Sequence, residues 1–183
     1  MSRSIALSLF VAISTLSAIQ ASAFDPAPDG FADMKWRSTK DEVKAVMEPK
    51  GAKPVKKWET PSKLVFDYGK LAGMGVDAWD IDFSDGKFWR GVATFSQSAP
   101  SERIFDVLKK MLSDKYGPPK REWHKPLLTI WTVDNPKTRE SVTITLHPRA
   151  FDDARIQLDY QNDEMKKHVR PEEDAGTPNP SGL

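Results

Sequence analysis

Residues 76–97 read VDAWDIDFSDGKFWRGVATFSQ, and this stretch decides the fold. Apolar residues alternate with aspartates up to a turn at residues 84–86, and apolar residues alternate again after it. This alternation around an Asp-Gly turn is typical of a β-hairpin. The remaining elements are therefore expected to pack around a sheet that contains this hairpin.

The turn leaves two registers open, because a shift of one residue moves every side chain to the other face of a sheet. A two-residue turn pairs Phe83 with Phe88 and puts Arg90 on the apolar face. A three-residue loop pairs Phe83 with Lys87 and sets Arg90 opposite Asp80 on the other face. We predict the second register, in which the buried face carries six apolar residues: Trp79, Ile81, Phe83, Trp89, Ala93 and Phe95.

The first 23 residues have the pattern of a secretory signal peptide. One basic residue, Arg3, precedes an apolar run over residues 5–19, and an A-x-A cleavage motif follows at residues 21–23. The run is short for a membrane span, which needs about 20 residues. We therefore expect cleavage after Ala23, no stable membrane span afterwards, and a periplasmic or secreted location.

Composition narrows the class of protein. Removing residues 1–23 from the 183-residue chain leaves 160 residues, which suits one domain or two small repeats that share a core. The formal net charge of +1 lacks the basic excess of nucleic-acid-binding proteins, so no nucleic acid partner is expected. The chain has no cysteine, so its core depends on packing, and an exported chain of this kind fits a bacterial periplasm.

Two amphipathic helices are expected, one before the hairpin and one after it. The first covers residues 39–48 and begins with capping-box spacing between Thr39 and Glu42. The second covers residues 98–116 and ends at Gly117, just before two prolines. Alternating apolar residues predict four further strands, over residues 64–68, 127–134, 140–147 and 155–161.

The two halves of the chain share landmarks at an offset of 65 or 66 positions. The matches are Gly51 with Gly117, Trp58 with Trp123, Pro61 with Pro126, Phe66 with Trp131, and Phe95 with Tyr160. Any two αβββ stretches can be aligned at a few points, but two matched Trp-x-x-Pro motifs favour a duplication. We therefore predict an α+β fold made of two αβββ repeats, with an antiparallel sheet and two helices packed on one face.

The predicted organisation has five parts: a signal peptide (1–23), an extended lead-in (24–35), a first repeat (36–97), a second repeat (98–161) and a disordered tail (162–183). This tandem plan resembles β-lactamase-inhibitor-protein-like domains and other small periplasmic α+β proteins. The resemblance covers residues 36–161, and its motifs are the helix ending at residues 115–118 and the Asp-Gly hairpin. That family typically joins its repeats by disulfides, which this chain cannot form, so no binding residue is carried over.

No motif of a catalytic, metal or cofactor site is present. Asp80, Asp82 and Asp85 do not have calcium-loop spacing, because the glycine is in the seventh position and not the sixth. Neither a Gly-x-Ser-x-Gly elbow nor a phosphate-binding loop occurs. The chain has three histidines, none with a second ligand at zinc spacing: His124, His147 and His168.

The tryptophans are the remaining candidate binding residues. Trp58 and Trp123 occupy matching positions before the first strand of each half, and Trp36 and Trp89 are further candidates. Such side chains either cover the ends of the sheet or line a groove for a partner, and the core interpretation is favoured. A basic run over residues 50–57 is either a solvated loop or a contact for an acidic partner.

The sequence thus predicts an exported, non-enzymatic binding or adaptor domain of the bacterial envelope, whose partner is a protein or a small envelope ligand. Two alternatives remain open. One is an envelope hydrolase whose site is assembled from both repeats. The other is a purely structural component of an envelope complex.

Overall fold

A computed structural model describes residues 24–95, 101–124, 127–149 and 152–169. It confirms the α+β class, with a mostly antiparallel sheet and three helices. These are α1 (Lys40–Met47), α2 (Ser101–Tyr116) and α3 (Asp163–Lys166). The predicted signal peptide lies outside the described residues.

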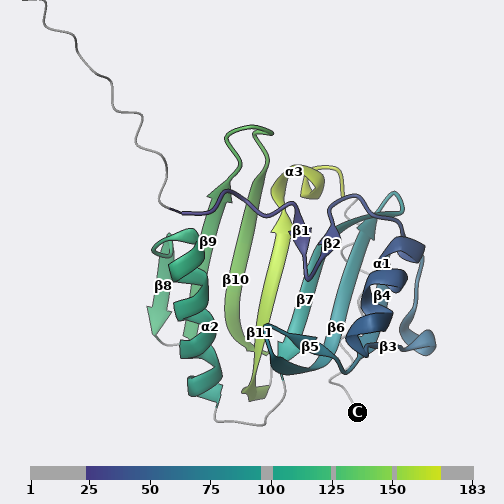
Figure 1. Cartoon of the computed structure of the whole chain (residues 1–183), viewed down its shortest axis with the longest axis horizontal. Helices are drawn as coiled ribbons and strands as arrows, with labels where there is room; N and C mark the ends of the chain where they lie inside the picture. Colours follow the sequence, from purple (N-terminus) through teal and green to yellow (C-terminus); the bar gives the residue numbers. More distant parts are fainter. Residues whose placement is uncertain (1–23, 96–100, 125–126, 150–151, 170–183) are drawn as a thin grey trace, which may run out of the picture.

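Nine strands form the main sheet. Eight follow the order β3-β4-β6-β7-β11-β10-β9-β8, and β5 pairs with β6. Their bounds are β3 (Lys53–Pro54), β4 (Lys63–Asp67), β5 (Lys70–Leu71), β6 (Met74–Ser84), β7 (Lys87–Phe95), β8 (Arg121–His124), β9 (Leu127–Asp134), β10 (Ser141–Arg149) and β11 (Asp152–Asn162). A separate pair, β1 (Gly30–Phe31) and β2 (Met34–Lys35), lies in front of the sheet (Figure 1).

The first helix begins and ends as its sequence predicts. Both halves of the capping box are present, with the Thr39 hydroxyl accepting from the Glu42 N–H and the Glu42 carboxylate accepting from the Thr39 N–H. Val43 and Met47 are fully buried on its inner face. After a 3-10 turn, η1 (Glu48–Lys50), Gly51 adopts a left-handed φ of 76° and stops the helix.

The predicted register of the β6–β7 hairpin is wrong near its turn. The Asp-Gly turn has two residues, both with positive φ (48° and 70°), and Phe83 pairs with Phe88. A β-bulge then shifts the pairing between Phe83 and Asp82: Trp89 on β7 is the extra residue, and Asp82 lies opposite Arg90. With this bulge, the hairpin keeps its tight two-residue turn and still directs Arg90 away from the core.

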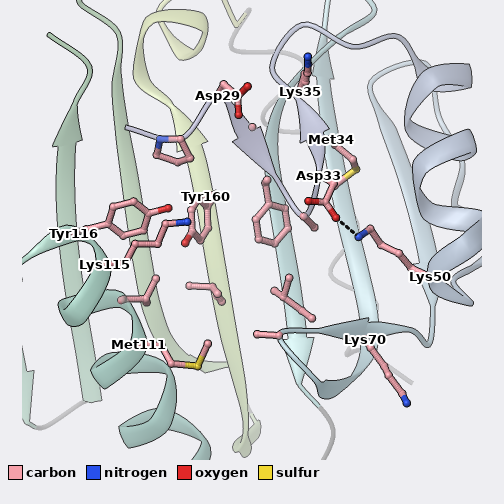
Figure 2. Close-up of a pocket in the computed structure, with 18 residues that line it drawn as sticks. Asp29, Asp33, Met34, Lys35, Lys50, Lys70, Met111, Lys115, Tyr116 and Tyr160 are labelled. Carbon is pink, nitrogen blue, oxygen red and sulfur yellow. Dashed lines mark hydrogen bonds and ion pairs between the residues drawn. The ribbon is translucent and has the colours of Figure 1, made fainter. Parts of the chain in front are cut away.

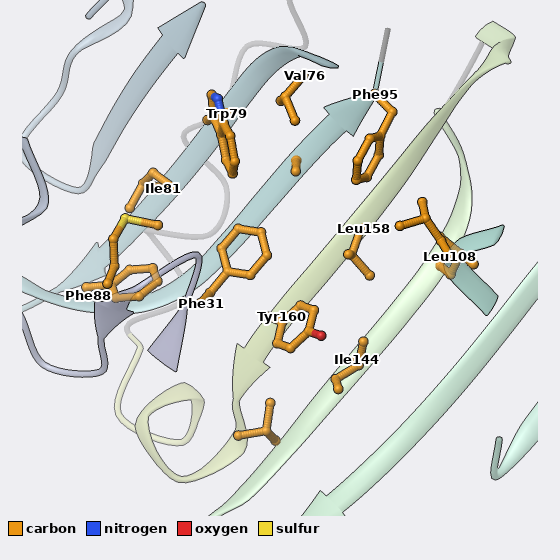
Figure 3. Packing of buried hydrophobic residues seen from close by; sticks show 14 of the residues in the cluster. Phe31, Val76, Trp79, Ile81, Phe88, Phe95, Leu108, Ile144, Leu158 and Tyr160 are labelled. Carbon is orange, nitrogen blue, oxygen red and sulfur yellow. The ribbon is translucent and has the colours of Figure 1, made fainter. Parts of the chain in front are cut away.

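The bulge also changes which hairpin residues pack beneath the helices. Five of the six residues predicted there belong to the hydrophobic core cluster, whereas Trp89 is buried outside it and Phe88 takes its place. Figure 3 shows Phe88 beside Ile81 on the same side of the sheet. The prediction of a buried apolar face is thus confirmed except at the bulge.

Several segments differ from their predicted form. The lead-in over residues 24–35 is not merely extended, because it contains the β1–β2 hairpin with buried Phe31 and Met34. The tail does not begin at Asn162, since that residue ends β11 and caps α3 by accepting from the Met165 N–H. Residues 170–183 lie outside the described part. Strands β3, β5 and β8 had no prediction, because their residues are largely exposed and do not alternate.

Candidate functional site

A cleft of about 610 Å³ opens on the side of the sheet that carries the helices. Its walls are α2, the β1–β2 hairpin and β5, and its floor is β11 (Figure 2). This volume lies within the range of about 300–1,000 Å³ that is usual for small-molecule sites. The residues that build it come from five segments of the chain: residues 28–35, Lys50, residues 70–72, residues 111–116 and residues 158–160.

The β1–β2 hairpin forms one wall of the cleft. Its shape depends on a tight turn and on a glycine at its first residue. Ala32 and Asp33 both have positive φ, 50° and 67°, as a tight two-residue turn requires. A side chain at Gly30 would lie 1.8 Å from the Met34 carbonyl oxygen, so this position needs glycine. The Trp36 indole N–H donates to the Pro28 carbonyl at 2.8 Å and closes the hairpin.

Phe31 anchors the hairpin to the centre of the sheet. Its ring stacks on Tyr160, with centroids 4.9 Å apart, and lies 6.0 Å from the ring of Trp79. Glycine at position 91 makes room for it, because a Cβ there would lie 2.3 Å from the Phe31 ring. The position of this wall therefore depends on one aromatic contact and one missing side chain.

The last two turns of α2 form the opposite wall. Helical spacing puts Met111 and Lys115 one turn apart on the same side of α2. Met111 is 42% exposed although it is apolar, while Leu112 beside it is buried. Figure 2 shows Lys115 directed from α2 toward the cleft, and its ammonium lies 5.1 Å from the centre of the Tyr116 ring.

Two tyrosines meet at one corner of the cleft: Tyr160 lies on the floor, in β11, and Tyr116 lies on the wall, in α2. Burial raises the pKa of the Tyr160 phenol well above its ordinary value, and the neighbouring Tyr116 raises it further through charge and a side-chain hydrogen bond. Tyr160 is therefore neutral at physiological pH and keeps its hydrogen. An uncharged phenol beside an ammonium group suits the binding of an anion.

The rim of the cleft carries more positive than negative charge. Four lysines line it, Lys35, Lys50, Lys70 and Lys115, against two aspartates, Asp29 and Asp33. Lys50 is ion-paired with Asp33 at the hairpin turn, as Figure 2 shows. The floor and inner walls are apolar and include Phe31, Leu71, Met111 and Leu158. The cleft can accept a small molecule with an apolar body and a negatively charged group.

The four tryptophans predicted as binding residues do not meet in one place, and none lines the cleft. Trp36 and Trp89 are buried, whereas Trp58 and Trp123 are 40% and 41% exposed. Trp58 lies in η2 (Lys56–Trp58), against β4, and Trp123 lies in β8 at the other edge of the sheet. With strands about 4.8 Å apart, these two are separated by about 30 Å, so they cannot line a shared groove.

A charged cluster occupies the face of the sheet turned away from α1 and α2. The Arg90 guanidinium donates to both carboxylate oxygens of Asp159 and, at 3.1 Å, to Asp82. Asp80 is ion-paired with Lys63 at 2.7 Å instead of with Arg90. Burial raises the pKa of the Asp82 carboxyl, although the positive charge of Arg90 acts in the opposite direction. The cluster joins three neighbouring strands, β6, β7 and β11.

The three histidines lie apart from one another, and within the described residues no group of three or more potential metal ligands occurs. The His124 side chain is 84% exposed on β8 and lies 3.8 Å from Glu122. His147 lies on β10, with its Nδ1 2.7 Å from the carbonyl oxygen of Pro148. The hydrolase alternative therefore gains no support from these two positions.

Sequence reasoning missed the cleft. The sequence predicts Met111 and Lys115 in a helix and Tyr160 in a strand, which is where they lie, but it does not predict that they meet. By its spacing Met111 belongs to the apolar stripe of the helix, so the sequence does not reveal that it is exposed at the cleft. The opposite wall comes from residues 28–35, about 80 positions away, and no periodicity reveals that contact.

Comparison of the chain with protein-family models, with curated proteins and with solved structures finds no match in any of the three. The predicted resemblance to β-lactamase-inhibitor-protein-like domains thus stays a prediction. Within the described residues, every helix is too short or too polar to cross a membrane.

Proposed function

We propose that this protein is an exported binding protein of the bacterial envelope that holds a small anionic amphiphile in the cleft between α2 and the β1–β2 hairpin. One observation carries the proposal: a cleft of about 610 Å³ has mixed apolar and polar walls and is lined by four lysines against two aspartates, although Lys50 is paired with Asp33 and Lys115 lies 4.0 Å from Asp25. The signal-peptide pattern of residues 1–23 supports export. Mass spectrometry of the protein purified from the periplasm tests export. The measured mass should match a chain that begins at Phe24.

Different residues of the cleft would contact the charged group and the apolar part of the ligand. Lys115 and the Tyr116–Tyr160 pair bind the charged group, because they bring one ammonium and two phenols to the same corner. Met111, Leu71 and Leu158 cover the apolar part. Met111 is apolar and 42% exposed, so a ligand that removes its side chain from water lowers the free energy of the complex.

Binding of dodecanoate, measured by isothermal titration calorimetry, tests the proposal. Dodecyltrimethylammonium, which has the same tail and the opposite charge, should bind at least tenfold more weakly. Met111→Asp should abolish binding of dodecanoate, whereas Val107→Asp should not. Val107 is the matched control, since it lies one turn earlier on α2, is 43% exposed and does not line the cleft.

A second pair of variants tests the head group. Lys115→Met should weaken dodecanoate binding by about two- to fivefold, the range expected for an exposed ion pair. The Lys115 side chain is 54% exposed, and in the free protein its ammonium lies 4.0 Å from the Asp25 carboxylate. Lys110→Met is the control, because Lys110 pairs with Asp114 on the solvent side of α2. Equal binding by the four variants, or equal affinity for the two detergents, would refute the proposal.

We also infer that residues 36–97 and 98–161 are copies of one αβββ unit, each contributing one helix to the same face of the sheet. The central pair supports this inference, since Ala93 of β7 faces Leu158 of β11, its own counterpart 65 positions later. Phe66 pairs with Trp79 in the first half. At the same offset, Trp131 pairs with Ile144 in the second half.

This symmetry is tested by superposing the two halves of an experimental structure. With Phe66 placed on Trp131 and Phe95 on Tyr160, the two αβββ units should superpose without a register shift between β4–β6 and β9–β10. A shift of one residue there would contradict the duplication, because it would place opposite faces of the two units together.

A further inference from the structure

The edge of the sheet at β3 combines exposed aromatic rings with unpaired lysines. We call this surface the β3 edge patch and define it as Lys53, Lys56, Lys57, Trp58 and Tyr68. Trp58 is 40% exposed and Tyr68 is 60% exposed, which is unusual for side chains of this size. The patch lies along the outer side of β4, where η2 and Tyr68 mark its two ends.

Each ring of the patch has a lysine next to it. The Lys57 ammonium lies 4.5 Å from the centre of the Trp58 ring, and the Lys53 ammonium lies 5.6 Å from that of Tyr68. Lys53, Lys56 and Lys57 form no ion pair with any described residue. Two acidic residues lie nearby. Glu59 is ion-paired with Lys44 at 2.9 Å, and Asp67 lies opposite Lys53 in the β3–β4 pair. Within the described residues, the patch thus has three lysines against one unpaired carboxylate.

The backbone holds Tyr68 outward at some cost. Its φ of 63° is left-handed, a conformation that is rare for a bulky aromatic residue. Two hydrogen bonds fix it, one from the Trp79 indole to the Tyr68 carbonyl at 2.7 Å and one from the Tyr68 N–H to the Asp77 carbonyl at 3.0 Å. Backbone strain of this kind is concentrated at functional sites.

We propose that the β3 edge patch docks the protein on the surface of an anionic phospholipid bilayer. Tryptophan and tyrosine are favoured at bilayer interfaces, where one end of the ring is apolar and the other is wet. Lysines near an anionic surface each raise the binding constant by about fivefold. The patch offers three lysines and two rings along about 10–17 Å of one edge, which matches a surface of lipid head groups.

A nucleic acid is the less favoured partner of this patch. Single-stranded nucleic acids bind in basic grooves that follow the backbone over several nucleotides. Neither of the two described cavities includes a patch residue in its lining. An exposed sheet edge with three lysines and two aromatic rings fits a bilayer better.

Co-sedimentation of the purified chain with vesicles tests the proposal. Vesicles of phosphatidylglycerol and phosphatidylcholine in equal parts should bind the protein, and vesicles of phosphatidylcholine alone should not. Binding should fall by at least tenfold when salt rises from about 50 mM to about 500 mM, because salt screens exposed charges. Binding to both vesicles alike would overturn the proposal, and so would stronger binding to a single-stranded oligonucleotide.

Variants locate the contact. Replacing Lys53, Lys56 and Lys57 together by glutamine should reduce binding at least tenfold. The same change at three lysines elsewhere, Lys110, Lys137 and Lys166, should have much less effect. Trp58→Ala should weaken binding and Trp123→Ala should not, although the two rings are equally exposed. Equal loss in the patch and control variants, at unchanged melting temperature, would show that only the total charge matters.

Discussion

Replacing Gly91 by alanine tests whether Phe31 holds the wall of the cleft. A Cβ at position 91 would lie 2.3 Å from Phe31 Cδ1 and 2.9 Å from Cε1, whereas ordinary contacts begin at 3.4 Å. The ring must therefore retreat by about 1 Å. It has little room, because it is 3% exposed and stacks on Tyr160 at 4.9 Å.

The expected cost of Gly91→Ala follows from this crowding. Overpacking a core by one methyl group destabilises a protein by about 1–3 kcal/mol. A loss of about 2 kcal/mol lowers the melting temperature of a chain of this size by about 4–8 °C. Strand backbone alone would favour alanine over glycine by about 0.5–1 kcal/mol, so the sign of the change separates the two effects.

A double-mutant cycle measured by urea unfolding supplies the control. Phe31→Ala alone should cost about 3–5 kcal/mol, as usual for a buried phenylalanine. In that background, Gly91→Ala should be neutral or slightly stabilising, because the ring that it crowds is gone. Additive costs in the cycle, or a neutral Gly91→Ala in the wild-type protein, would refute the account of the hairpin as a wedge over Gly91.

Two further predictions concern the charged cluster and the exposed tryptophans. Burial raises the folded pKa of Asp82 above the ordinary value of 3.8, so wild-type stability relative to Asp82→Asn should be greatest below that value and should fall as pH rises through the folded pKa. Urea unfolding between about pH 3 and pH 7 measures this difference, and a difference that is flat or rises with pH would contradict it. Trp58→Ala and Trp123→Ala should each change the free energy of unfolding by no more than about 0.5 kcal/mol, because both side chains are substantially exposed. Unfolding of both variants in thermal melts would restore the core interpretation.

Local signals in the sequence were enough for most elements. The capping box at Thr39 and Glu42 depends on residues three positions apart, and it is present. The alternating run at residues 127–134 forms β9 with the predicted bounds. The two short edge strands, β3 and β8, were missed because an edge strand needs no apolar face.

The hairpin register shows a different limit. The alternation of apolar residues correctly predicts that Arg90 points away from the core. A two-residue Asp-Gly turn in a regular hairpin would instead put Arg90 on the apolar face, so the two signals conflict. The chain resolves the conflict with a bulge at Trp89, which puts this residue outside the core cluster. Because tryptophan suits either face, the pattern could not reveal the extra residue.

The candidate site could not be predicted, because its parts meet only in the folded chain. Phe31 stacks on Tyr160 across 129 positions, and Met111 faces this pair from α2. Each residue is ordinary within its own element. Their common property, an apolar cleft under a basic rim, arises from the packing of the hairpin against the sheet.

The methyl signals of the methionines in an NMR titration with dodecanoate test the central claim most directly. Met111 and Met34 line the cleft, whereas Met47 and Met165 lie elsewhere and serve as internal references. The proposed function predicts that the Met111 methyl signal shifts in a saturable manner and shows nuclear Overhauser contacts with the alkyl chain. Shifts confined to Met47 or Met165, or no saturable shift at Met111, would contradict it.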